Sequence, residues 1–476
     1  MSSGVPQVRD VGGASGDPVA AGGSQRRDPH RSEPPGLSEL CRRWLAAPVA
    51  LLASALAVVC VISLADILPQ VGLLFGSNER FVGWAGLGVC LGVGVTAVSL
   101  LLMRRTGAGP SLSAGAAAAV FGLALGYRVI DDLQVGLAFV MLGAAVGGLL
   151  TGAAGMAFEL PGRFRTAVLL AWVVPLVSGW PLVAWVALHD TATDEAQLTV
   201  HPSVWALAPV SAVIVLWSVV SMLVEPPRVQ APAAASWETA WSALLVVLVV
   251  GALAVMVAGF EPGIDVGWLR PLVVGVAGLV VVALAAVALV VPAVPARIGY
   301  VAVLVVCLSL PTCVQLMLVV TDAGAWRVSW IGAGLLAVSG VVGAGLGWRW
   351  PATSSWAAML VLAGACAGAW VMPDGMWTMF AAAAPLMAAA GAGTAAGVRL
   401  CTSSPTALRF VMLTVVGVIL LGVTLAIPLG WSLGGAVAST TADARAAGRV
   451  FLGLTFAAAV LAAAYIATLT PRLRAG

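Results

Sequence analysis

The sequence predicts an all-α polytopic membrane protein. Of its 476 residues, 61% are hydrophobic and only 9% are charged, and the mean hydropathy is +1.05. Soluble domains carry about 25% charged residues, so this composition excludes a soluble globular fold. The apolar residues lie in runs of about 20, the length with which an α-helix crosses the hydrocarbon core while bonding its own backbone.

Residues 1–40 differ from the rest of the chain because they are rich in Gly, Ser, Pro, Arg and Asp. Such a segment cannot bury enough apolar surface to fold, so we expect a disordered cytoplasmic tail that could recruit a protein partner. A signal peptide would place its apolar stretch closer to the start of the chain.

Beyond this tail, charged or Pro- and Gly-rich breaks separate the apolar runs, and we expect about fourteen transmembrane helices. The runs lie near 45–70, 82–103, 111–128, 134–157, 166–188, 203–224, 238–259, 271–292, 298–320, 329–348, 354–371, 376–397, 408–430 and 448–470.

Arginine is concentrated in the loops on the side of the two termini, and acidic residues are concentrated in the opposite loops. By the positive-inside rule, both termini are cytoplasmic. Lysine is absent and Ala, Val, Gly and Leu dominate, which is typical of a GC-rich coding bias. The sequence therefore predicts a multi-pass protein of a bacterial cytoplasmic (inner) membrane.

The first helical hairpin lies within Ser63–Gly115. An apolar run ends in Ile67-Leu68-Pro69, a polar bend follows at 76–80, and a second run ends at Arg104 and Arg105. The next residues, including Gly107, form a Gly- and Pro-rich turn. The hairpin therefore places a polar bend on one side of the membrane and an arginine-glycine turn on the other.

This hairpin resembles the fourteen-span drug:proton antiporter branch of the major facilitator superfamily. Ile67-Leu68-Pro69 matches the branch's "ALP" motif, and Trp84 matches the aromatic residue that opens its second helix. Arg105-Thr106-Gly107 and Gly115 fall in register with the R-x-G of its inner turn and a glycine of its third helix. The segment 159–165 looks like its inner loop between helices four and five.

The resemblance implies two six-helix bundles, at 41–225 and 296–476, with two additional transmembrane helices at 226–295. A substrate would bind near the midplane between the bundles, and rocking of the bundles would give alternating access. It also implies conformational roles for residues of the inner loops. The candidates are Arg104, Arg105 and Gly107 in the first bundle, Arg349 in the second, and Glu159 with Arg163, which form either a conformational latch or an ordinary interfacial pair.

Charges within the membrane are costly and are therefore functional candidates. Cys60, Arg104 and Phe139 occupy positions where the antiporter branch keeps ionisable residues. Asp66 remains near the outer end of the first helix, either as an interfacial carboxylate or as a coupling and substrate group. Gln315, beside a helix proline, either lines a cavity or makes a structural bond between helices.

The scarcity of buried charge favours a secondary transporter of a small, apolar or uncharged molecule, with efflux preferred over uptake. An alternative is a facilitator-like protein that no longer transports and serves as a scaffold or partner in envelope assembly. A more remote alternative is a glycosyltransferase using lipid-linked sugars, with Asp131-Asp132 as its acidic pair; these carboxylates also suit a helix start. No motif predicts an enzyme otherwise, a cofactor, a metal site or nucleic-acid binding.

Overall fold

The computed structural model describes residues 37–75, 79–127, 131–189, 204–224, 269–291, 293–309, 330–371, 376–434 and 441–474. These residues form thirteen helices, and none of them belongs to a strand. The all-α fold is confirmed. The predicted run at 238–259 lies outside the described residues, so a total of fourteen helices stays a prediction.

The first half of the chain contributes six helices, most of which begin and end close to the predicted runs. They are α1 (Leu37–Phe75), α2 (Glu79–Thr106), α3 (Gly109–Tyr127), α4 (Asp132–Glu159), α5 (Gly162–His189) and α6 (Val204–Val224). The first helix starts earlier than expected, because Leu37 and the residues after it, assigned by sequence to the tail, are helical.

The second half contributes seven described helices. They are α8 (Leu269–Val290), α9 (Val294–Leu308), α11 (Trp330–Arg349), α12 (Pro351–Val371), α13 (Met376–Cys401), α14 (Pro405–Gly434) and α15 (Thr441–Arg474). The bundle boundaries expected near residues 225 and 295 stay predictions.

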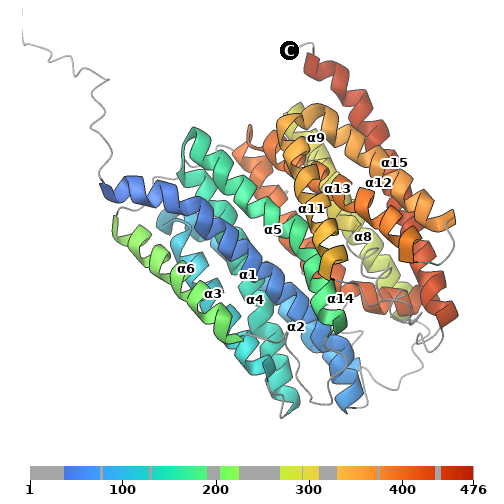
Figure 1. Cartoon of the computed structure of the whole chain (residues 1–476), viewed down its shortest axis with the longest axis horizontal. Coiled ribbons are helices and arrows are strands. Elements are labelled where there is room, and N and C mark those ends of the chain that lie inside the picture. The colour runs from blue at the N-terminus through green and yellow to red at the C-terminus, as the bar shows by residue number, and fades with distance from the viewer. Residues whose placement is uncertain are drawn as a thin grey trace, which may run out of the picture.

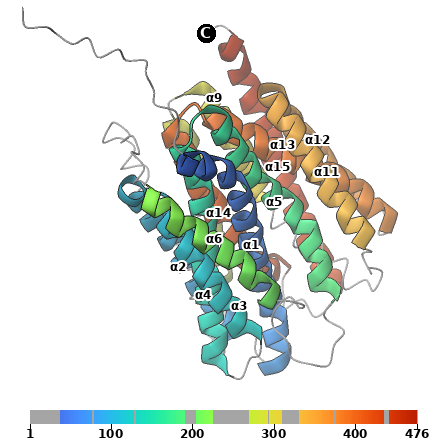
Figure 2. The same cartoon turned by 60° about the vertical axis from the view of Figure 1, so that its left-hand side comes forward.

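The helices pack as two groups (Figures 1 and 2). α1 to α6 contact one another, and α8, α9 and α11 to α15 do the same. The groups meet along two seams, where α5 contacts α11 and α13, and where α14 contacts α1, α2 and α4. The start of α1 and the end of α15 lie at the same end of the molecule, which we call the inner side (Figure 1).

Local sequence explains the sharp turns at the helix ends. Gly107 follows α2 with a φ of 75°, and its N–H donates to the carbonyl of Met103, which is the usual end of a helix in a left-handed glycine. At the start of α4, the Asp131 side chain accepts a hydrogen bond from the N–H of Gln134 at 2.7 Å. Asp131 is therefore a helix N-cap, one of the two roles that the sequence left open for it.

Glycines allow the closest helix approaches within each group. A methyl group added at Gly143 of α4 would overlap the carbonyl oxygen of Gly88 of α2, and one added at Gly391 of α13 would overlap that of Gly340 of α11. Small residues replace bulk at such crossings, because helices in lipid associate through close packing rather than through the hydrophobic effect. The pairs α2–α4 and α11–α13 thus use the same device.

Seven of the described helices are long and apolar enough to cross a membrane. The large apolar side chains at the periphery are exposed, as on α11, where Leu335, Val338 and Val342 are 55–63% exposed. Exposed apolar faces of this extent fit lipid rather than water. The prediction of a multi-pass membrane protein is confirmed.

Candidate functional site

The inner ends of α1, α2, α4 and α14 meet around Glu159, the last residue of α4. Its carboxylate accepts a hydrogen bond from Arg42 Nη2 of α1 at 3.0 Å and another from the Ala108 N–H, just before α3, at 2.6 Å. The side chains of Arg42 and Glu159 are 13% and 7% exposed. Glu159 therefore fastens α4 to α1 and to the start of α3, whose positive helix end favours an anion.

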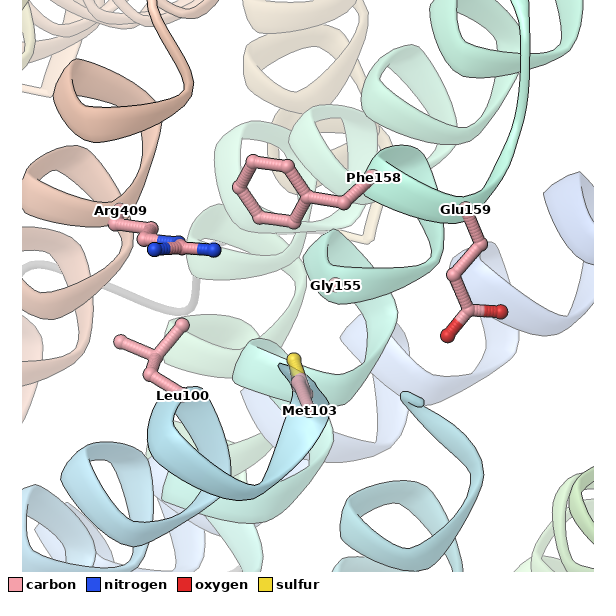
Figure 3. A pocket seen from close by; sticks show the side chains of 6 residues that line it. All are labelled: Leu100, Met103, Gly155, Phe158, Glu159 and Arg409. Carbon is pink, nitrogen blue, oxygen red and sulfur yellow. The ribbon is translucent and has the colours of Figure 1, made fainter. Parts of the chain in front are cut away.

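On the other side of α4, Phe158 contacts the second half of the molecule. The guanidinium of Arg409, in the first turns of α14, lies 5.5 Å from the centre of the Phe158 ring, within the range of a cation–π interaction. Arg409 is only 5% exposed. Figure 3 shows Arg409 pointing from α14 toward this ring, while Glu159 points away from it.

A cavity of about 10 Å³ lies between these groups, enough for about one water molecule. Its walls are formed by Leu100, Met103, Gly155, Phe158, Glu159 and Arg409. A side chain at Gly155 would come within 2.5 Å of the Met103 sulfur, so the glycine makes room for α2. The inner end of the seam between α14 and the first half, which we call the inner seam, is therefore closely packed and joins α2 and α4 to α14.

The latch expected from the inner loop has a different partner. Glu159 pairs with Arg42, 117 residues earlier in the chain, and not with Arg163. Arg163 instead lies over two aromatic rings, 5.9 Å from the centre of Trp44 and 5.0 Å from that of Phe164. Leu160 and Pro161 lie between the end of α4 and the start of α5 and are not helical. Glu159 and Arg163 therefore do not share one helix face, and their side chains point in different directions.

The other predicted turn residues lie where the sequence put them, at inner helix ends. Gly107 makes the turn between α2 and α3, and Arg349 ends α11, where its guanidinium lies 5.4 Å from the centre of the Trp350 ring. Arg104 and Arg105 are in the last turn of α2, and their side chains lie outside the described residues. Their conformational roles stay predictions.

The two candidates for substrate binding or coupling stay untested. Asp66 lies in α1, but its side chain is outside the described residues, and Gln315 lies outside them entirely. Cys60, which the resemblance to the antiporter branch aligns with an aspartate, is fully buried and is a free thiol.

Sequence reasoning missed Arg409 and Arg42, having counted both as ordinary positive-inside residues. A signal existed for Arg409, because it interrupts the apolar stretch of α14 instead of preceding it. Other inner arginines cap helix ends: Arg165 Nε donates to the carbonyl of Ala157 at 3.0 Å, and Arg297 Nη2 to that of Val291 at 2.9 Å. Arginines at carboxyl ends of helices satisfy free carbonyls and complement the dipole.

Within the described part of the chain, the buried polar side chains are mostly hydroxyls, besides Arg409 and the indole N–H groups of Trp172 and Trp217. Ser111, for example, donates to the Gly148 carbonyl and bonds with the Ser99 hydroxyl, while Tyr300 donates to the Leu284 carbonyl and bonds with Thr414. The described residues include no group of His, Cys, Asp or Glu that could hold a metal ion. These interiors can present hydroxyl groups and hydrocarbon, but little charge.

No protein-family model matches the sequence, and no curated protein matches it either. Solved structures do match the arrangement of helices. The human organic anion transporter MFSD10 gives a TM-score of 0.56 at 13% identity, covering 88% of this chain and 99% of that one. The chain has the fold of the major facilitator superfamily. The xylose transporter XylE from E. coli gives 0.51 at 11% identity, covering 90% and 99%.

A further match is the peptide transporter POT in complex with sulfate, with a TM-score of 0.52 at 13% identity, covering 90% of this chain and 95% of that one. All three of these proteins are transporters, and the superfamily fold expected from the first hairpin is confirmed. At these identities the likeness is one of fold.

Proposed function

We propose that the chain is a secondary transporter of major-facilitator type in a bacterial inner membrane, with cytoplasmic termini. One observation carries the proposal: two helix groups meet along two seams, α2 against α14 and α5 against α11. A side chain at Gly340 of α11 would come within 2.7 Å of Val177 Cγ1 of α5. Rocking of two such groups about their seams is how the fold gives alternating access.

The substrate that we infer is small and apolar or uncharged. A charged substrate buried at the midplane would need a buried partner of opposite charge. The described interior offers hydroxyls such as Thr96 and Thr414 instead, both fully buried, and its buried charges, Arg409 and the Arg42–Glu159 pair, lie at inner helix ends. Efflux is the direction that the resemblance to the drug:proton antiporter branch favours.

Counterflow of radiolabelled solutes into proteoliposomes tests this proposal, because counterflow needs no ion gradient. A panel of uncharged and charged compounds of similar size is compared, and we expect accumulation of uncharged ones. Repeating the assay with and without a pH gradient, and with Asp66→Asn, tests proton coupling. If neither the pH gradient nor Asp66→Asn alters the transport rate, the transporter is a uniporter. Exclusive counterflow of charged solutes would contradict the substrate class.

A cross-link across one seam tests alternating access directly. In Val177→Cys/Gly340→Cys the two sulfur atoms can reach bonding distance, since α5 and α11 approach each other closely at this point. We expect oxidation to reduce counterflow at least ten-fold and a reductant to restore it. The control is Val177→Cys/Gly345→Cys, because Gly345 has no atom of another residue near its added carbon. Unchanged counterflow in a fully cross-linked sample would contradict the mechanism.

A second candidate function is a scaffold of the same fold that does not transport. It is favoured by Cys60, a fully buried thiol where the antiporter branch has a coupling aspartate. A scaffold would show no counterflow for any solute, its cellular phenotype would survive the cross-link, and a stable partner would co-purify with it. In this second candidate function, the N-terminal tail recruits the partner.

A further inference from the structure

An arginine and two aromatic rings form a cluster at the inner ends of α1 and α5. The Trp44 and Phe164 rings meet edge to face, with centres 5.6 Å apart and planes at 84°. Arg163 lies within 6 Å of both ring centres. Two aromatic contacts restrict a long side chain to one orientation, so the guanidinium is held before any ligand arrives.

The donors of Arg163 are available for a ligand. Arg163 is exposed, and its guanidinium makes no hydrogen bond or ion pair with another described residue. The neighbouring arginines use their donors within the protein: Arg42 is paired with Glu159, and Arg165 donates to carbonyls at the end of α4. A planar guanidinium with free donors suits a phosphate group, which it can bind through two parallel bonds.

The surroundings of Arg163 favour an anion and contain no competing acid. It lies in the first turn of α5, and that turn holds no acidic residue. The free N–H groups and the dipole at a helix start attract negative charge. The nearest carboxylate along the chain, that of Glu159, is already bonded to Arg42 and Ala108.

An apolar face leads from this cluster into the membrane. Along α1, Trp44, Pro48, Leu51 and Ala55 are all exposed and recur at the spacing of one helix face, with Trp44 and Leu51 at 59% and 40%. The apolar span of this helix begins at Arg42. Trp44 is therefore at the depth of the headgroups, where tryptophan side chains concentrate, and the residues after it face acyl chains.

From this juxtaposition we propose that α1 and α5 form a binding site for one anionic phospholipid on the inner side of the membrane. Arg163 and the start of α5 bind the headgroup phosphate, Trp44 lies beside it, and an acyl chain follows Pro48, Leu51 and Ala55. This proposal does not rest on the proposed transport function. A phospholipid, and not free phosphate, is the expected ligand because the apolar face continues directly from the charged cluster.

Titration of the full-length, delipidated protein in mild detergent tests the site, with the thermal unfolding midpoint as the measured quantity. Phosphatidylglycerol should raise the midpoint. For Arg163→Gln, the concentration giving half of this effect should increase about five-fold, as expected for one arginine at a membrane surface. For Arg163→Lys, this concentration should lie between those of the unmodified protein and Arg163→Gln, because lysine keeps the charge but not the planar donors.

The matched control is Arg449→Gln, which removes the same charge from an exposed arginine near the start of α15, at the opposite end of the molecule. It should bind phosphatidylglycerol as the unmodified protein does. Equal loss in Arg449→Gln, or no loss in Arg163→Gln, would overturn the site. An equal midpoint shift with phosphatidylcholine would overturn the anionic requirement, and one with inorganic phosphate would overturn the assignment to a lipid.

Discussion

The two halves of the molecule join corresponding helices at their inner ends through opposite chemistry. In the first half, α4 ends in Glu159, whose carboxylate binds the N–H at the start of α3 and is paired with Arg42. In the second half, α13 carries Arg399 in its last turn, and its guanidinium donates to the carbonyl of Trp348 near the end of α11. One half presents an anion to the positive end of a helix, and the other a cation to a negative end.

This difference teaches which feature the fold requires and which it leaves open. In both halves, a helix that packs against its neighbour also binds the turn at the inner end of that neighbour: α4 packs on α2 and binds the α2–α3 turn, and α13 packs on α11 and binds the α11–α12 turn. A side chain of either charge can make this contact. The environments differ, however, because Glu159 and Arg42 are largely buried whereas Arg399 is exposed. We therefore expect equal geometry but unequal energies, and the following experiments test that expectation.

Substitution of the glycines at the helix crossings should cause the largest loss of stability, and the loss should be equal in both halves. Gly143→Ala and Gly391→Ala each force a methyl group onto a backbone carbonyl that cannot move without its helix. We expect each to lower the free energy of unfolding by about 3 kcal/mol, at the upper end for overpacking. Reversible unfolding in detergent, followed by circular dichroism, measures this.

Two further glycines on the partner helices serve as controls for these crossings. Gly94 of α2 and Gly345 of α11 have open space where a methyl group would lie. Alanine at either position should be neutral or should stabilise by up to about 1 kcal/mol, because alanine is the better helix former. If Gly391→Ala were as mild as Gly345→Ala, α11 and α13 would not share the packing of α2 and α4.

Breaking the buried pair should come next in size. Glu159→Gln leaves the Arg42 guanidinium without its counter-charge, and removal of one member of a fully buried pair costs about 3–5 kcal/mol. We expect a smaller loss of about 2–3 kcal/mol here, since both side chains retain some exposure. Arg42→Gln/Glu159→Gln should recover part of it, because no lone charge remains. A double variant less stable than the sum of the single variants would contradict the pairing.

The sequence predicted the fold well because the fold depends on patterns local in the chain. Apolar runs predicted the positions of the helices. Gly107 was expected in a turn, where glycine adopts a positive φ more easily than other residues. The site was predicted less well. Arg163 is four positions from Glu159 and was the natural partner, but Arg42, 117 residues away, is the actual one. Which arginine is buried depends on how distant helices pack, and a single sequence does not contain that information.

Arg409 illustrates the same limit on the seam between the halves. From sequence, Arg409 was counted among the positive-inside arginines, whereas contact with Phe158 buries it. The residues of a helix pattern indicate which face is apolar but not which charged residue another helix will cover. The inner seam could therefore be located from sequence only as a set of loops.

Weakening this contact should have a moderate effect that involves both halves. Phe158→Leu keeps an apolar side chain but removes the ring, so we expect a loss of about 1 kcal/mol. It should also increase modification of Leu100→Cys by a membrane-impermeant maleimide applied from the inner side, since Leu100 is 4% exposed beside the same cavity. The control is Phe121→Leu on the exposed face of α3, where the ring is 53% exposed. It should change neither the free energy of unfolding nor the maleimide modification.

The smallest effect should come from Arg399→Gln, the counterpart of Glu159→Gln. Arg399 is exposed, and water can replace it at the Trp348 carbonyl, so the bond and the ring contact of 6.0 Å contribute little. Exposed charge interactions contribute about 0–1 kcal/mol, and we expect a loss of about 0.5 kcal/mol, reduced further at high salt. A loss as large as that of Glu159→Gln would mean that the sign of the charge, and not its burial, sets the strength of these helix-end contacts.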